Sequence, residues 1–255
     1  MARKRDAHPD TLDELASLAD RAREWIEENP LKLLGAVAAV LLAAAIASVV
    51  VVQQGRQREA AARALAEAEA DFRVAMGGEP DSLDVPEPAN PETARSAREA
   101  YLARLEEILA EHGGAAGALA ALRAGDVAEE LGDRERALSL FEQGRDRAPR
   151  GSPLRAILEE RRAVLLEDLG RLEEASGAHE AAAEVEAFPL RYRALADAAR
   201  TALQAGDPER ARALYERVRN EAPDLSLPAH VREPLEELLV AGGGSAGADN
   251  TQANP

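Results

Sequence analysis

Apolar positions recur at intervals of three and four residues along most of the chain, and one stretch is apolar throughout. That stretch, LLGAVAAVLLAAAIASVVVV at residues 33–52, holds 20 consecutive positions without a charge. At about 1.5 Å of rise per residue, a helix of this length covers about 30 Å, the thickness of the hydrocarbon core of a bilayer. The spacing elsewhere is typical of helices with one buried face. The pattern predicts an all-α protein with a single N-terminal transmembrane helix.

A cleaved signal peptide is the alternative interpretation of this stretch, because Ala45-Ile46-Ala47 resembles a cleavage site. Against it, the preceding segment contains eight acidic residues, and Val49 to Val52 continue past the supposed cut. We therefore expect an uncleaved anchor at residues 31–54. Lys and Arg are slightly more numerous before the span than after it, which favours a cytoplasmic N-terminus.

Residues 1–30 form the predicted cytoplasmic segment. Its apolar residues recur at helical spacing and predict an amphipathic helix lying at the membrane surface: Leu12, Leu15, Leu18, Ala22, Trp25 and Ile26. Within the span, small residues fall four apart, at Gly35, Ala39, Ala43 and Ala47. Such a ridge lets a second helix approach closely, which makes a homo-oligomer through this helix possible. The span is so rich in alanine that such a ridge is also expected by chance.

Residues 55–91 follow as a membrane-proximal helix and a loop. One helical face is predicted to carry Ala61, Leu65, Ala68, Phe72 and Met76. The loop reads GGEPDSLDVPEPANP, at residues 77–91, and its four prolines and two glycines exclude regular structure. A further helix is predicted at 92–112, from the spacing of Ala94, Ala97, Tyr101, Leu105 and Ile108.

Three later stretches repeat one pattern: LGDRERALSLFEQGRDRAP at 131–149, LGRLEEASGAHEAAAEVEA at 169–187 and AGDPERARALYERVRNEAP at 205–223. Each predicts a helix, a tight turn at a glycine and a second helix. The turn glycines are Gly132, Gly170 and Gly206, and five residues after them stand Ala137, Ala175 and Ala211. Four residues further on, the bulky positions are Phe141, His179 and Tyr215, and the small partners in the first helices are Gly125, Ala163 and Ala199. Small residues at these places let two antiparallel helices pack closely.

This pattern resembles the tetratricopeptide repeat. The turn glycines are 38 and 36 residues apart, close to the family's period of about 34. The large aromatic residue that the family carries early in the first helix is replaced by Ala121, Glu159 and Leu195, and His179 replaces the aromatic of the middle second helix. The resemblance implies a helical-hairpin solenoid over residues 92–240, with the 92–112 helix and a short helix around 230–240 as its caps. Residues 241–255, AGGGSAGADNTQANP, are predicted to be disordered.

The composition of the chain bears on which kinds of functional site it can contain. The chain has no cysteine, which excludes disulfides and thiolate metal sites, and its net charge of −16 with no basic stripe disfavours nucleic-acid binding. The four histidines are scattered without metal-ligand spacing, and His179 occupies a core position of its repeat. We find no catalytic constellation, and predict no enzyme, cofactor or metal.

The remaining candidate is a protein-binding groove, which the resemblance places on the first helices of the repeats. Its predicted lining is Leu119, Leu122, Asp126, Glu129, Glu130, Ile157, Glu160, Val164, Glu167, Ala196, Arg200 and Leu203. Repeat domains of this family that clamp a C-terminal carboxylate carry Lys and Asn there. Acids with aliphatics favour an apolar or basic extended peptide instead. The alternative is a groove that packs the chain's own loop or helix.

The whole layout resembles the ancillary subunit of the bacterial Sec translocon. The resemblance is carried by a short acidic helix, an anchor opening IEENPLKLLGAVAAVLL, an alanine-rich helix leaving the membrane, a GGEPDSL loop and degenerate repeats. It implies a single-pass inner-membrane protein with a periplasmic repeat domain. The implied partners are translocon subunits, periplasmic chaperones and exported chains. A scaffold in another cell-envelope complex, for cell-wall synthesis or outer-membrane assembly, is the alternative.

Overall fold

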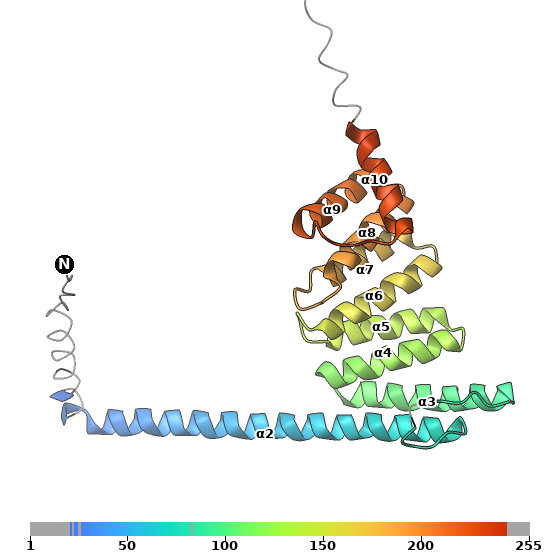
Figure 1. The fold of residues 1–255 in the computed structure, drawn as a ribbon. Coiled ribbons are helices and arrows are strands. Elements are labelled where there is room, and N and C mark those ends of the chain that lie inside the picture. Colours follow the sequence, from blue (N-terminus) through green and yellow to red (C-terminus); the bar gives the residue numbers. More distant parts are fainter. Residues whose placement is uncertain (1–20, 22, 25–26, 83, 244–255) are drawn as a thin grey trace, which may run out of the picture. The chain divides into compact units, whose positions relative to one another are not determined.

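The computed structural model describes residues 21, 23–24, 27–82 and 84–243, and within them the chain forms helices, turns and loops only (Figure 1). The chain divides into two compact units, Met1–Gln57 and Arg58–Pro255. Most of the predicted N-terminal amphipathic helix lies outside the described residues. So do residues 244–255 of the predicted disordered tail.

The first described helix is α2, Pro30–Ala75, which contains the whole predicted span. Among the described residues it is the helix that is long and apolar enough to cross a membrane, by length and composition. The small-residue ridge of Gly35, Ala39, Ala43 and Ala47 is exposed along it. Packing of this ridge against another helix stays a prediction.

The second unit begins with the last part of α2 and α3, Pro91–Glu111, which are joined by the predicted loop. Gly77 ends α2 with a φ of 90°. Asn90 caps α3 by accepting a hydrogen bond from the backbone N–H of Glu92, and Pro91 occupies the first turn, where its missing N–H costs nothing. The rings of Phe72 and Tyr101 stack with centroids 4.5 Å apart and fasten the two helices together.

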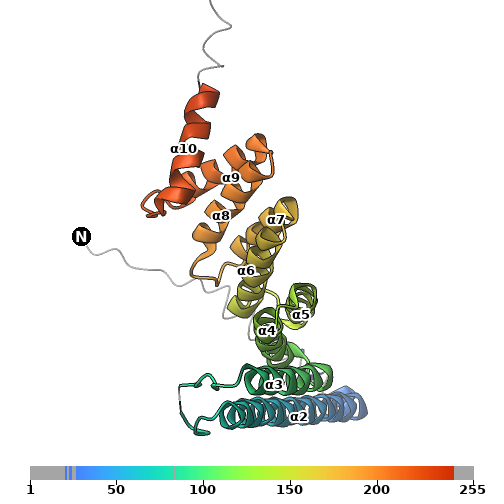
Figure 2. The same cartoon turned by 90° about the vertical axis from the view of Figure 1, so that its right-hand side faces the viewer.

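Three helical hairpins follow, as the repeat pattern predicts. They are α4 (Gly114–Glu130) with α5 (Arg134–Arg147), α6 (Pro153–Asp168) with α7 (Leu172–Ala183), and α8 (Arg191–Gln204) with α9 (Pro208–Glu221). Figure 2 shows the first helices α4, α6 and α8 on one side of the stack and the second helices α5, α7 and α9 on the other. Helix α10, Ala229–Gly243, packs on α8 and α9 and closes the stack.

The predicted turn glycines are confirmed. Gly132, Gly170 and Gly206 have φ values of 83°, 73° and 88°, in the left-handed region that costs a glycine little. In the first turn the N–H of Asp133 bonds back to the carbonyl of Ala128 at 2.9 Å, which satisfies the end of α4. The side chain of Asp133 then caps α5.

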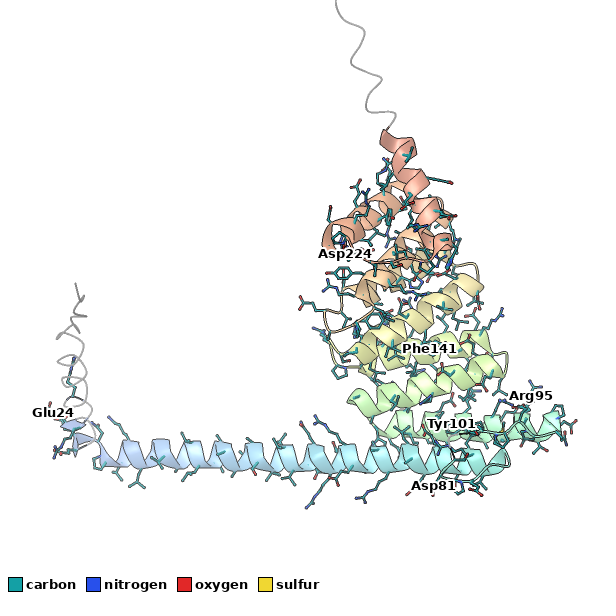
Figure 3. The ribbon with its side chains drawn as sticks, in the orientation of Figure 1. Glu24, Asp81, Arg95, Tyr101, Phe141 and Asp224 are labelled. Atoms are coloured by element: carbon teal, nitrogen blue, oxygen red, sulfur yellow. The ribbon has the colours of Figure 1, made fainter. Side chains whose placement is uncertain are left out.

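The predicted close packing of the hairpins is confirmed as well. Ala137, Ala175 and Ala211 are completely buried. Phe141, also buried, lies inside the stack (Figure 3) against Gly125, where an added Cβ would come within 2.3 Å of the Phe141 ring.

The family's missing aromatic positions are core positions here too, because Ala121, Glu159 and Leu195 are all buried. Burial raises the pKa of the Glu159 carboxyl, and Arg145 and Arg162 oppose that rise. Arg162 Nη1 lies 3.4 Å from a Glu159 oxygen. The middle repeat therefore replaces an aromatic contact with a buried ionic one.

One boundary in the structure differs from the one predicted from the sequence. The predicted disordered tail begins at residue 241, but α10 continues through residues 241–243. Once a helix has formed, each further residue adds a hydrogen bond without a new nucleation cost, so Ala241 extends the helix and the glycines at 242 and 243 do not end it at once.

Candidate protein-binding face

The predicted groove residues lie on the first helices, and we call the surface that they form the first-helix face. Helix α4 carries Leu119, Leu122, Asp126, Glu129 and Glu130, α6 carries Ile157, Glu160, Val164 and Glu167, and α8 carries Ala196, Arg200 and Leu203. Leu119, Ile157 and Val164 are 37%, 39% and 47% exposed, so large aliphatic side chains do face solvent here. Leu122 and Leu203 are half-buried against the core.

Ala196 does not line an open groove. It is 0% exposed and belongs to the core cluster of the last repeat. It stands ten residues before its turn glycine, the position that Leu122 and Glu160 occupy in the earlier repeats. The side chains of leucine and glutamate are long enough to extend beyond the core, whereas the methyl group of an alanine at the same position remains buried.

Most acids of this face are engaged by arginines that lie outside the predicted set of groove residues. Arg98 of α3 bonds Glu130 at 2.8 Å and also Glu87 of the preceding loop at 2.7 Å. Arg161 of α6 pairs with Asp126 and lies 3.7 Å from Glu129 on α4. These carboxylates therefore link neighbouring helices instead of standing free for a ligand.

The spacing of charges along the sequence could have identified these arginine partners. Arg98 and Glu130 are 32 residues apart, and Arg161 and Asp126 are 35 apart. Both separations are close to one repeat period. Residues one period apart occupy neighbouring helices of the stack, so opposite charges at that spacing are candidates for inter-repeat ion pairs.

His179 is the centre of a buried ionic network on α6, α7 and α8. Its side chain is 3% exposed, with Nδ1 2.8 Å from a carboxylate oxygen of Glu160 and Nε2 2.8 Å from one of Glu167. Arg200 donates to both oxygens of Glu167, at 2.8 and 2.9 Å. The side chains of Asp197 and Thr201 complete the network.

The two carboxylates keep this histidine charged. Burial by itself lowers the pKa of His179, but the hydrogen bonds with Glu160 and Glu167 outweigh it and raise the pKa to about 9. Burial raises the pKa of Glu167, and the bonds from His179 and Arg200 overcome that and lower it to about 2. The network therefore holds an imidazolium between two carboxylates at neutral pH. The repeat pattern predicted only a core-packing role for His179, so the charge on its imidazole was not predicted from the sequence.

A pocket of about 380 Å³ opens above the network, and we call it the α6–α8 pocket. Its lining is Glu160, Val164, Glu167, Asp168, His179, Leu190, Arg193, Ala194, Asp197 and Arg200. Leu190 is 55% exposed at its rim. The pocket thus combines exposed aliphatic side chains with carboxylates, of which Glu160 and Glu167 were predicted groove residues.

A second, smaller pocket of about 240 Å³ lies where α2, α3 and α4 meet. Val85 of the loop between α2 and α3 borders it, together with Asp126 and Glu130 of α4. Glu87 of the same loop is bonded to Arg98. At this end the chain's own loop borders Asp126 and Glu130 of the first-helix face.

Across residues 21, 23–24, 27–82 and 84–243, no group of three or more His, Cys, Asp or Glu side chains is arranged to hold a metal ion. Besides its carboxylates and the imidazole, the histidine network contains the guanidinium of Arg200 and the hydroxyl of Thr201.

Comparisons with known proteins give distant structural similarity only. No protein-family model matches the chain, and comparison with curated proteins gives no match. A solved structure described as a putative kinesin light chain of Podosopora anserina with nearly identical TPR-like repeats is similar at 18% identity and a TM-score of 0.44, over 59% of this chain and 82% of that one. A single-substitution variant of that protein matches at 18% identity and a TM-score of 0.42, over 58% and 86%. The assignment of tetratricopeptide-like hairpins here rests on the turn glycines and the buried alanines.

Proposed function

We propose that this chain is a membrane-anchored, non-enzymatic protein-binding module that works beside the Sec translocon, where it links exported chains to periplasmic chaperones. The observation that carries the proposal is a single chain that joins a span-length apolar helix to a repeat domain with exposed aliphatic side chains on its first-helix face. Stacked helical hairpins present extended surfaces of this kind to protein segments.

The chemistry of the face supports a polypeptide ligand. Leu119, Ile157 and Val164 offer apolar contacts spread over two repeats, while the ion pairs between them hold the helices in place. A small-molecule substrate needs a deep, convergent pocket, whereas these side chains lie along a surface. The resemblance in layout to the translocon's ancillary subunit implies the proposed location: inner membrane, N-terminus in the cytoplasm and repeats in the periplasm.

Photo-crosslinking in native membranes tests the proposal. A crosslinking amino acid at Ile157, on the first-helix face, should capture translocon subunits, exported chains or chaperones. The matched control places it at Ser139, which is exposed on α5 on the other side of the stack. In the same cells, protease added to intact spheroplasts should digest the repeat domain.

The alternative function, a scaffold for cell-wall synthesis or outer-membrane assembly, is separated by the same experiment. Proteins of those systems at Ile157, and no channel subunit or exported client, would replace the leading proposal. Equal capture at Ile157 and Ser139 would reject the first-helix face as the binding surface, and a protease-protected domain would reject the periplasmic location.

A further inference from the structure

Each carboxylate of the first-helix face has an ion-pair partner. On α4, Glu130 is bonded by Arg98, and Asp126 and Glu129 pair with Arg161. On α6, Glu160 and Glu167 are bonded to His179. The side chain of Asp168, which lines the α6–α8 pocket beside this face, has neither a hydrogen bond nor an ion pair with another described residue. Asp168 therefore places an unpaired carboxylate in this pocket.

Glu160 adds a free acceptor oxygen to the same pocket. One of its oxygens is bonded to His179 at 2.8 Å, whereas the other accepts no hydrogen bond from the described residues. Since His179 and Arg200 are both occupied by carboxylates, the network does not offer a donor to an incoming anion. Arg193 on the rim is the one basic lining side chain of this pocket without such a partner among the described residues.

Exposed aliphatic side chains flank these acceptors. Val164 of α6 and Leu190 at the start of α8 line the same pocket and are 47% and 55% exposed. A lysine or arginine side chain matches this combination, because its methylene stem covers apolar surface while its charged end reaches carboxylates. The chain's overall negative charge attracts the same class of ligand over longer distances.

Building on the proposed function, we infer that the α6–α8 pocket binds a lysine or arginine side chain of a partner polypeptide, with its stem on Val164 and Leu190 and its charge at Asp168 and Glu160. The pocket thereby sets which segments of a client protein bind: those in which a basic residue lies among aliphatic ones. Helix α4 contributes apolar contact through Leu119.

Peptide binding to the full-length protein in lipid nanodiscs tests this inference. The probes are fluorescent twelve-residue peptides of alternating valine and lysine, valine and serine, and valine and glutamate. The valine–lysine peptide should bind most tightly and the valine–glutamate peptide most weakly. Asp168→Lys should weaken binding of the valine–lysine peptide by about three- to tenfold, since a local attraction becomes a repulsion.

Two matched controls separate local contact from general effects. Glu216→Lys makes the same charge change at an exposed position on α9, so it should leave the affinity within about twofold of the wild type. Val164→Ser should weaken binding, whereas Val240→Ser, at an exposed valine of α10, should not. Circular dichroism of each variant establishes that the helices are retained.

The possible failures are distinguishable. If valine–serine and valine–lysine peptides bind equally well and Asp168→Lys changes neither, the cation pocket is wrong while the protein-binding function stands. If Asp168→Lys and Glu216→Lys weaken binding equally, the effect is long-range and the pocket assignment is again overturned. If none of the peptides binds the wild type, peptide binding by this face is rejected as well.

Discussion

At the scale of single residues, each hairpin depends on a small residue facing a bulky one, and the tightest case is Gly125 against Phe141. Because the Phe141 ring lies where a Cβ on residue 125 would stand, the two positions are complementary. The later repeats carry alanine in place of this glycine and His179 or Tyr215 in place of the phenylalanine. The close approach is therefore shared, but its side chains differ from one repeat to the next.

Gly125→Ala should destabilise the domain although alanine is the better helix former. The helix propensity gain of about 1 kcal/mol is opposed by overpacking that costs about 1–3 kcal/mol, since the new methyl group would lie 2.3 Å from a Phe141 ring carbon. Urea unfolding measures the change. The control is Gly177→Ala, in the middle of α7 with no neighbouring atom within 4 Å, which should stabilise the protein. Equal stabilisation by both substitutions would contradict the packing account.

At the scale of elements, charged side chains link one helix to the next. Arg98 links α3 to α4, Arg161 links α6 to α4, and Glu167 links α6 to α8 through Arg200. The exposed pairs contribute little individually, about 0–1 kcal/mol each. The buried network around His179 differs, because removal of one partner leaves buried charges without compensation.

The stability of the wild type should fall as the pH rises from about 6.5 through about 9. The pKa of His179 is raised to about 9 in the folded protein, so its contribution is fully present below the unfolded value of about 6.5 and is lost above 9. The difference between the folded and unfolded pKa values of His179 corresponds to a loss of stability on the order of 3 kcal/mol. Glu160 and Glu167 of α6 and Asp197 and Arg200 of α8 are the charged groups that face it.

Urea unfolding at about pH 6 and about pH 9.5, on either side of this window, measures the loss. His179→Gln should be less stable than the wild type at the lower pH and should show little further loss at the higher one, because the titrating group is gone. His230→Gln, at an exposed histidine of α10, serves as the control and should keep the wild-type profile. An unchanged slope in His179→Gln would mean that another group causes the pH dependence.

At the scale of the whole molecule, the repeat domain is a row of hairpins in which each packs on its sequence neighbours. Its core falls into separate clusters, a larger one around α3 to α7 and another around α8, α9 and α10. In such a row stability is approximately a sum of local terms, so damage at one end stays near that end. Helix α10 buries Val231 and Leu235 against the last cluster and acts as its cap.

Leu235→Ala should cost about 2–5 kcal/mol by opening a cavity under the cap. The side chain of Leu235 is completely buried, whereas Val240 on the same helix is 78% exposed, so Val240→Ala should have little effect. Hydrogen exchange should show a larger loss of protection in α8 and α9 than in α3 and α4. A uniform loss over all hairpins would show that the domain unfolds as one cooperative unit.

The helices, the turns and the repeat were predictable from the sequence, because these features depend on interactions within a few residues of the chain. The glycines at 132, 170 and 206 and the alanines five residues later were predicted correctly for that reason. Most residues of the first-helix face were identified from their positions on the first helices of the repeats. The span-length helix followed from composition alone.

Which charged side chains pair and which stay unpaired depends on how the hairpins stack, and the sequence pattern did not predict it. Arg161 and Asp126, 35 residues apart, meet because successive hairpins stack with a particular offset. The same stacking buries Ala196, encloses His179 between two carboxylates and leaves Asp168 without a partner among the described residues. These outcomes depend on distances between helices far apart in the chain, to which hydrophobic periodicity is insensitive.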